Sequence, residues 1–558
     1  MKEKEAPRVL IVGAGPTGLM LACQLAQRSV PFRIIDKNED HTTQSRALVV
    51  QARSVEIFGQ MGLAQLALQL GEKARAVNVV VNGKQVLHMN IRDIGEGLTP
   101  YPYLLMLEQS KTEHLLNDFL AVRGHTVERQ TALLDVTQDA DAVTATIKHA
   151  QREEEVLRVD WLVGADGAHS VVRDKLNIPF AGKTYQQSLF VLDCEVSLPL
   201  PSDEMSIAFA ESAFAGFFPL TNGRCRVIGT VPERCEGQET ISFEEVAQDF
   251  AQRLKMNVSL HHPEWISLYH SHHRAVSAFR LGRCFLAGDA AHIHSPVGAQ
   301  GMNTGLQDAY NLAWKLALVS QGKARATLLN TYHDERAPIA HALVQTTDRA
   351  FHLVTSNDPL LKTFRLHILP VLMQTVVPLA QNQRWLREAG FKTISQIGIH
   401  YRQSILSQED PQSHFPNQAP KPGDRVPYLP TTDYAVGTQD LVQGTRFHFV
   451  LFSGEAPNET AQQILQNLQA AYPGLMAFHD LRLLAETKAL YETFGIEKQG
   501  YYVVRPDSHI AYRNASLDTH HFNTELHPLL WNSESLGYTI SGFGDGRREI
   551  MSERRDPF

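Results

Sequence analysis

Three glycines near the start of the chain have the types and spacing needed to hold a diphosphate. The run Gly13-Ala-Gly15-Pro-Thr-Gly18 follows a β-branched stretch at 9–12 and precedes a helix-compatible stretch at 19–28. The first glycine permits a tight turn, the second lets the backbone approach a pyrophosphate, and the third lets helix and strand pack closely. The helix N-terminus adds free N–H groups and a partial positive charge. We therefore predict a dinucleotide-type site that also includes Pro16 and Thr17.

An aspartate at the end of the second predicted strand completes this pattern. Asp36 follows the strand at 32–35, and it lies 36 − 13 = 23 positions after Gly13. A carboxylate near this spacing binds the hydroxyls of an adenosine ribose and repels a 2′-phosphate. We include the adjacent Lys37 in the same site. The pattern disfavours NADP here but does not separate NAD from FAD.

Two later segments repeat the order of strand, glycine and acid. Gly164-Ala-Asp166-Gly167 follows the stretch 161–163, and Gly288-Asp289 follows 283–287. Ligands of open α/β sheets bind at the carboxyl ends of the strands. Either segment alone could be an ordinary turn closed by aspartate. With the first glycine run, they give the chain three segments of the kind that bind a ligand at the ends of parallel strands.

The glycine-rich loop after Asp289 leads into a long predicted helix. The loop reads His294-Ser-Pro296-Val-Gly298-Ala-Gln-Gly301-Met302-Asn303, and apolar residues then recur at helical spacing over 306–319. The N-terminus of this helix directs a positive dipole at a ligand in front of it. His294 is a candidate for site chemistry because it flanks the loop, whereas we expect His292 to be structural.

Residues 180–275 read as short strands separated by turns, and with 76–88 they predict a mostly antiparallel sheet over the ligand. Aromatic side chains in this layer give it an apolar surface suited to an aromatic molecule. Each of them could equally be a core residue. The substrate candidates are Phe190, Phe209 and Phe218.

In combination, these motifs resemble the FAD-dependent aromatic hydroxylases, the class A flavoprotein monooxygenases similar to para-hydroxybenzoate hydroxylase and phenol hydroxylase. The resemblance covers about residues 8–345. It implies FAD as the cofactor, with Asp289 on the ribityl chain and the Asp166-Gly167 segment near the pyrophosphate and NAD(P)H. It also implies that Pro296 lies next to the reactive flavin carbon, with Arg46 and His294 as further catalytic candidates. The cofactor residues implied by motif and resemblance are Gly13, Gly15, Pro16, Thr17, Gly18, Asp36, Lys37, Arg46, Gln109, Asp166, Gly167, Gly288, Asp289, Pro296, Gly298, Gly301, Met302 and Asn303.

The same resemblance implies a reaction. NADH or NADPH reduces FAD, O₂ forms a C4a-hydroperoxide on the flavin, and one oxygen atom is transferred to a phenolic or related aromatic ring. The chain has a single dinucleotide motif, so we expect NAD(P)H to bind transiently. A related epoxidase, Baeyer–Villiger oxygenase or antibiotic-modifying hydroxylase stays open, as does a flavin-binding protein without turnover. An NAD dehydrogenase would leave the Gly288-Asp289 segment unexplained. The substrate, the hydroxylated position, the acid or base and the choice between NADH and NADPH are not identified.

Composition excludes several other classes. The 558 residues carry a net charge of −8, which argues against a nucleic-acid partner, and the five cysteines are too few for a disulfide framework. The histidines at 261–262 and 270–273 lack metal-ligand spacing, so we predict no metal. The apolar stretch 366–379 contains two prolines and polar residues, which favours a buried or interfacial helix pair over a membrane span. We expect a cytoplasmic protein.

The predicted fold class is α/β, a Rossmann-like FAD-binding domain with an inserted, mostly antiparallel substrate sheet and a C-terminal thioredoxin-like domain. A strand at 447–452, a helix at 459–471 and a hairpin at 501–513 predict the last domain. It contains no cysteine, so we expect a structural role in stability or oligomer contacts, and a homodimer stays open. The boundaries are 1–75, 104–180 and 276–345 for the FAD domain, 76–103 and 181–275 for the substrate domain, 346–407 for a helical closure, 408–430 for a linker and 431–558 for the thioredoxin-like domain.

Overall fold

A parallel sheet organises the N-terminal half of the chain. The computed structural model describes residues 6–42, 47–150, 153–211, 213–295, 298–356, 358–432 and 435–531. Its first sheet has the order β17-β18-β11-β1-β2, and the four strands from β18 to β2 are parallel. Every residue of β1 is buried, as expected for a parallel strand covered on both faces. The bounds are β1 Val9–Val12, β2 Phe32–Ile35, β11 Trp161–Gly164, β17 Arg280–Leu281 and β18 Cys284–Leu286.

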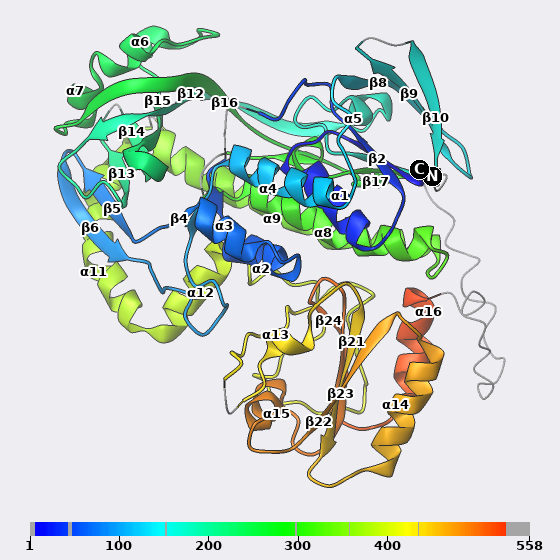
Figure 1. The fold of residues 1–558 in the computed structure, drawn as a ribbon. Helices are drawn as coiled ribbons and strands as arrows, with labels where there is room; N and C mark the ends of the chain where they lie inside the picture. The colour runs from blue at the N-terminus through cyan, green and yellow to red at the C-terminus, as the bar shows by residue number, and fades with distance from the viewer. Residues whose placement is uncertain are drawn as a thin grey trace.

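Helices cover this sheet and connect its strands (Figure 1). Helix α1 packs against both α4 and α8, so the glycine run at its start lies beside the long α8. Two small three-stranded sheets flank this layer, with the orders β10-β9-β8 and β3-β7-β4. The bounds are α1 Pro16–Gln27, α2 Ala52–Gln60, α3 Ala64–Leu70, α4 Gln109–Val122, α5 Val171–Lys175 and α8 Gly301–Ser320, with β3 Val49–Val50, β4 Glu72–Lys73, β7 Leu105–Met106, β8 Thr131–Gln138, β9 Val143–His149 and β10 Glu154–Val159.

The predicted substrate layer is an eight-stranded sheet with the order β19-β16-β12-β15-β14-β13-β5-β6. All neighbours are antiparallel except β13 and β5, which are parallel. The bounds are β5 Ala76–Val81, β6 Lys84–Asn90, β12 Phe180–Ser197, β13 Met205–Phe209, β14 Phe214–Pro219, β15 Cys225–Thr230, β16 Ser259–Val276 and β19 His292–Ile293, with the short helices α6 Phe243–Ala247 and α7 Phe250–Leu254.

The segment after α8 is helical, as predicted, but its apolar part is not buried. Helices α9 Asn330–Thr355, α10 Pro359–Thr363, α11 Leu369–Asn382 and α12 Arg384–Ile394 follow one another, and α11 lies beside β6 at the outer edge of the molecule (Figure 1). The helical stretch Pro359–Leu379 is long and apolar enough to cross a membrane by length and composition, and 11% of its most apolar part is buried.

A separate five-stranded sheet forms the C-terminal unit (Figure 1). The predicted strand, helix and hairpin are present as β21, α14 and β23–β24, whereas the name thioredoxin-like stays a prediction. The expected linker 408–430 begins with β20, which pairs with β24, and its Val426 packs into this unit's core. The bounds are β20 Gln408–Glu409, β21 Phe447–Gly454, β22 Met476–Arg482, β23 Gly500–Val504 and β24 Ile510–Asn514, with α13 Thr438–Leu441, α14 Glu459–Ala471, α15 Lys488–Phe494 and α16 His527–Leu530.

Candidate cofactor and substrate site

The ends of four parallel strands meet at one edge of the first sheet. The Gly13 N–H donates to the Ile35 carbonyl at 2.8 Å, and the Ala165 N–H donates to the Val12 carbonyl at 2.8 Å. On the other side, the Ala287 N–H donates to the Gly164 carbonyl at 3.0 Å. The glycine run and the two acidic turns therefore lie at one edge of this sheet.

The glycine run is closely packed on both sides and open in its middle. Gly13 has a φ of +102°, and a Cβ there would overlap the Ala165 carbonyl. A Cβ on Gly18 would overlap the Gly13 carbonyl, so neither position accepts a side chain. In contrast, no heavy atom lies within 4 Å of the Cβ position of Gly15. This open space at the N-terminus of α1 fits a diphosphate that approaches the backbone.

Asp36 closes the glycine loop from the neighbouring strand. Its carboxylate accepts the Ala14 N–H at 2.7 Å and the Asn38 N–H at 2.8 Å. A carboxylate has about four acceptor positions, so these bonds leave capacity for a ribose hydroxyl. Lys37 is exposed beside it. Ribose binding by Asp36 stays a prediction.

Thr17 joins the first glycine run to the turn after β18. Gly288 has a φ of +60°, and a Cβ there would lie 2.5 Å from Thr17 Oγ1. A Cβ on Gly305 of α8 would overlap the same hydroxyl. The structure therefore brings Thr17 and Gly288 together with the first turns of α8, in close packing that only glycine permits.

The aspartate after β11 faces its own helix. Asp166 Oδ1 accepts the Ser170 hydroxyl at 2.5 Å, and Oδ2 accepts the Val172 N–H at 3.2 Å at the start of α5. Burial raises the pKa of the Asp166 carboxyl, against the effect of these hydrogen bonds. Gly167 supplies the turn with a φ of +79°. The Asp166 carboxylate thus holds the turn and helix in place.

The aspartate after β18 is arranged differently. Asp289 is exposed, while its neighbours Gly288 and Ala290 are buried. Arg173, which sequence reasoning did not single out, donates to the Ala290 carbonyl at 3.2 Å and to the Ala168 carbonyl at 2.9 Å. This buried guanidinium joins the two acidic turns.

A buried network of charged and polar side chains from α8, α9 and His292 holds the turn after β18. Asp308 of α8 accepts the Gly288 N–H at 3.1 Å, His292 Nε2 at 2.7 Å and Arg336 Nε at 2.7 Å. Burial opposes the charge on Asp308, but Arg336 and His292 outweigh it and hold the pKa of the carboxyl below its ordinary value. Sequence reasoning missed Asp308 and Arg336. A charged residue among the apolar positions of the predicted helix was the available signal.

His294 is buried and neutral. Its Nδ1 lies 2.8 Å from the Ser295 carbonyl, which can only accept, so Nδ1 carries the proton. Burial lowers the pKa of His294 to about 4. The remaining Nε2 is an acceptor that lies 3.3 Å from the Cβ position of Gly301.

Unsatisfied polar atoms gather around the loop before α8. Within the described ranges, His294 Nε2, His292 Nδ1 and Gln51 Oε1 are buried and have no hydrogen-bond partner. The Gln51 amide nitrogen lies 3.5 Å from the Gly298 carbonyl, which places this side chain at the same loop. Buried polar groups without partners are costly, so this cluster fits a site completed by a polar ligand such as a flavin.

The other predicted cofactor residues have mixed surroundings. Asn303 is buried, and its amide contacts the protein: it accepts the Gln51 N–H and the Ser54 hydroxyl at 2.8 Å and donates to the Val49 carbonyl at 2.8 Å. Met302 is partly buried against the first core, and Gly301 begins α8. Gln109 begins α4 and donates to Glu113 at 2.9 Å. The predicted residues Arg46 and Pro296 lie outside the described residues.

The substrate sheet separates the three candidate phenylalanines. Strand register places Phe209 and Phe218 on one face, where Phe218 packs against the same cluster as Ala299 of the loop before α8. Phe209 is buried in another cluster on that face, with Val79, Val81 and Leu366. Phe190 is fully buried on the opposite face, within the core cluster that contains Phe217 and Phe250. Of the three candidates, Phe218 alone packs near the loop before α8.

A buried ion pair lies on the same face as Phe218. Arg226 forms two bonds to Asp193, at 2.8 and 2.7 Å, and also donates to the Ala47 carbonyl at 3.3 Å. The Trp265 indole donates to Asp193 at 3.0 Å. Opposite charges on neighbouring strands were the sequence signal for this pair, which we missed. The pair fixes the sheet against the loop that precedes β3.

The C-terminal unit contacts α8 and α9 through a buried turn. Arg505 donates to Glu335 at 2.7 and 2.8 Å and to Asp507 at 2.6 Å, and Lys315 donates to Glu335 at 2.8 Å. Burial lowers the pKa of Lys315 to about 8, although Glu335 acts in the opposite direction. The Arg53 guanidinium donates to the Asp507 carbonyl at 2.7 Å. These contacts support a structural role for the unit.

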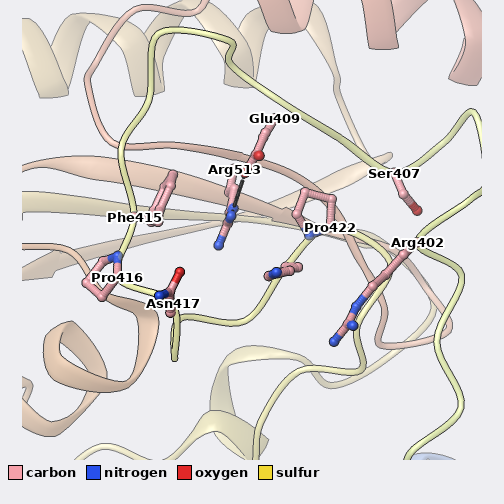
Figure 2. Close-up of a pocket in the computed structure, with 9 residues that line it drawn as sticks. Arg402, Ser407, Glu409, Phe415, Pro416, Asn417, Pro422 and Arg513 are labelled. Carbon is pink, nitrogen blue, oxygen red and sulfur yellow. Dashed lines mark hydrogen bonds and ion pairs between the residues drawn. The ribbon is translucent and has the colours of Figure 1, made fainter.

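A polar cavity of about 310 Å³ lies elsewhere, between residues 402–422 and β24 (Figure 2). Its cations Arg402 and Arg513 pair with Asp424 and Glu409, each at 2.6 Å. None of the residues that line it comes from the strand-end edge or the loop before α8, so we do not assign the cofactor to it. Over the described part of the chain, no group of three or more His, Cys, Asp or Glu side chains could hold a metal.

Comparisons with known proteins agree with this geometry. The family model described as "FAD binding domain" matches residues 7–347. The chain is 37% identical over 413 residues to 6-methylpretetramide 4-monooxygenase of Streptomyces rimosus, covering 73% of this chain and 72% of that protein. It is 30% identical over 441 residues to pentachlorophenol 4-monooxygenase of Sphingobium chlorophenolicum, covering 78% of each. The solved anhydrotetracycline hydroxylase OxyS from Streptomyces rimosus is similar with a TM-score of 0.73 and 26% identity, over 94% of this chain and 98% of that one.

Proposed function

This chain belongs to the FAD binding domain family and, within it, to the FAD-dependent aromatic monooxygenases, and we propose that it uses NADH or NADPH and O₂ to hydroxylate a phenolic or related aromatic substrate. The observation that carries the proposal is the position of the loop at 298–301, between the strand-end edge and the substrate sheet. The loop leads into α8 at Gly301 beside the edge where the parallel strands end, and its Ala299 packs against the same hydrophobic cluster as Phe218 of the substrate sheet. A cofactor at the edge and a ring on the sheet would meet at this loop.

The residues at the strand ends would bind and orient FAD. The open backbone at Gly15 and the N-terminus of α1 would take the diphosphate. Asp36 would accept a ribose hydroxyl, and the exposed Asp289 would accept a ribityl hydroxyl. The backbone under Asp289 is held by Asp308, so its carboxylate is presented from a rigid turn.

Bound FAD supplies the redox chemistry, which is hydride acceptance from NAD(P)H and transfer of one oxygen atom from O₂. The protein provides orientation, exclusion of water and charge stabilisation. The N-terminus of α8 contributes a partial positive charge at the loop. On the sheet side, Phe218 would hold the aromatic ring by apolar contact and keep water out.

His294 is better suited to accept a hydrogen bond than to remove a proton. Its pKa of about 4 lies far below that of an ordinary phenol, about 10, so a phenol proton would not be held on Nε2 at neutral pH. We therefore assign His294 to orientation of a donor group at the loop, in place of general-base catalysis.

A substrate panel tests the proposed reaction. Single-ring phenols and fused-ring phenols are incubated with the purified protein, FAD and NADH or NADPH, and both NAD(P)H oxidation and product mass are measured. We expect at least one phenol to stimulate oxidation and to gain one oxygen atom from ¹⁸O₂. Oxidation of NAD(P)H without an oxygenated product for any compound would contradict the hydroxylase proposal. Products of ring expansion or epoxide formation would instead identify a related flavin oxygenase.

A matched pair of variants tests the substrate face. Phe218→Leu should raise the KM of the substrate several-fold, whereas Phe190→Leu should lower the thermal unfolding midpoint with the KM unchanged, because the two rings lie on opposite faces. Each substitution replaces a ring by a smaller apolar side chain, at a cost of about 1 kcal/mol in a packed core. The reverse assignment of the two effects would show that the substrate binds on the other face.

A further inference from the structure

Helix α11 carries an apolar stripe that faces away from the protein. Ile368, Val371, Leu372, Val376 and Leu379 recur at the spacing of one helix face, and all are exposed, Val371 at 57% and Leu379 at 68%. A surface helix normally turns its apolar stripe toward the core. The stripe runs over 11 steps, about 16 Å at the usual helical rise.

The opposite face of the same segment is firmly packed. Leu366 is buried with Val79, Val81 and Phe209, and Met373 packs against this cluster. Arg365 donates to the Val354 carbonyl at 2.6 Å and holds the start of the segment to α9. The helix is therefore anchored on one side, and its outward stripe is a property of the folded chain.

The neighbouring helices also expose large apolar side chains. Leu360 of α10 is 81% exposed, and Trp385 of α12 is 66% exposed. Among the described residues, nine of the fifteen large exposed hydrophobic side chains fall within 359–394. Such a concentration marks an interaction site, since scattered single residues are the norm on a protein surface. We call residues 359–394 the α10–α12 surface.

The charge of this surface is opposite to that of the whole chain. Apart from the buried Arg365, residues 359–394 contain four Lys and Arg and one Glu, a net charge of 4 − 1 = +3, whereas the chain carries −8. Arg384 and Arg387 are exposed on either side of Trp385. Arg384 contacts Glu388 at 2.7 Å and Lys392 contacts it at 3.9 Å, so this one carboxylate serves two cations.

We propose that the α10–α12 surface docks onto an anionic lipid bilayer and lies in the plane of its interface. Apolar side chains, an exposed tryptophan and flanking Lys and Arg on one helical surface are the features of interfacial helices. Clustered cations are attracted to anionic headgroups. The packed inner face of α11 keeps the helix parallel to the surface, because spanning the bilayer would require it to leave β6 and the Phe209 cluster.

Charge favours a bilayer over a second copy of the chain. Two copies paired face to face through this surface would bring a charge of +3 against +3. Like charges at an interface oppose association, whereas anionic headgroups neutralise the same cations.

Vesicle co-flotation of the FAD-loaded full chain tests the proposal. The vesicles contain phosphatidylcholine alone or with about 30% phosphatidylglycerol, at about 0.05 M and about 0.5 M NaCl. We expect binding to the anionic vesicles, reduced about tenfold or more by high salt or on neutral vesicles. Failure to bind anionic vesicles at low salt would overturn the proposal.

Matched variants locate the binding. Val376→Ser with Leu379→Ser should abolish binding, and Arg384→Glu with Arg387→Glu should remove the preference for anionic vesicles without disturbing packed residues. Leu66→Ser with Val122→Ser, which alter exposed apolar residues elsewhere, should bind like the parent chain. FAD absorbance and the unfolding midpoint confirm folding. If the surface variants bind vesicles normally, or instead convert a dimer into a monomer in light scattering with no vesicle binding by the parent, the lipid assignment is wrong.

Discussion

The turn after β11 and the turn after β18 both place an aspartate beside a glycine at the end of a parallel strand, but they use the carboxylate in different ways. Asp166 turns back to its own helix and bonds to Ser170 and Val172. Asp289 is exposed between two buried residues. The difference arises from what supports the backbone of each turn.

In the turn after β18, a side chain from another element supports the backbone. Asp308 of α8 accepts the Gly288 N–H and so holds the backbone just before Asp289. In the turn after β11, Asp166 itself accepts the hydrogen bonds that hold the turn. The backbone of a strand-end turn can therefore be held by its own acid or by a residue of another element.

Removing the support should have the largest effect. Asp308→Asn keeps the shape of the side chain but leaves the buried Arg336 without its counter-charge. Breaking a buried pair in this way costs about 3–5 kcal/mol. We expect a large fall in the thermal unfolding midpoint together with loss of FAD, measured by calorimetry and flavin absorbance. An unchanged midpoint would show that Asp308 does not hold the turn.

His294 should make stability depend on pH. Its folded-state pKa of about 4 lies below the ordinary 6.5, so the unfolded chain takes up a proton more readily as pH falls. The stabilisation from neutral His294 is complete above pH 6.5 and is lost as pH falls toward 4, in total about 3 kcal/mol.

The measurement is the unfolding midpoint between pH 7 and pH 4 for the parent chain and His294→Gln. The variant should lose less stability over this range. The exposed His262, replaced by glutamine, serves as the control and should follow the parent chain. Parallel curves for all three proteins would contradict the burial of a neutral His294.

Removing the Asp166 carboxylate, which holds its own turn, should have the smallest effect on stability. Asp166→Ala removes the acceptor for Ser170 and for the first N–H groups of α5, a loss of about 1 kcal/mol for a helix cap. We expect a small fall in the unfolding midpoint of the FAD-free protein. Asp166→Asn retains one acceptor oxygen and should recover part of the difference. A variant as stable as the parent would show that the cap is unimportant.

The parts that sequence predicted depend on local pattern. The helix Glu459–Ala471 was predicted from its own stretch of sequence, and in the structure the Asn458 side chain caps its start by accepting the Ala461 N–H. The glycine run and the strand-end acids follow one another along the chain, so their meeting at one edge follows from a parallel sheet. These features need no knowledge of distant contacts.

The parts that sequence missed depend on distant partners. Asp308 and Arg336 lie on different helices, and neither residue type reveals the pairing. Alternation in a strand tells which residues share a face but not which face meets the ligand, so Phe190 could not be separated from Phe209. Similarly, the apolar spacing in α11 indicates a stripe without indicating whether it faces inward, and the stripe is exposed.

The FAD dissociation constant of Asp289→Ala, with Asp166→Ala as its matched control, tests the central claim most directly. Both variants remove one strand-end carboxylate. We expect Asp289→Ala to bind FAD about 10 to 100 times more weakly, through loss of a charged hydrogen bond. Asp166→Ala should bind FAD within about threefold of the parent chain once folded. Parent-like FAD binding by Asp289→Ala, with weakened binding by Asp166→Ala, would contradict the assignment of the two turns.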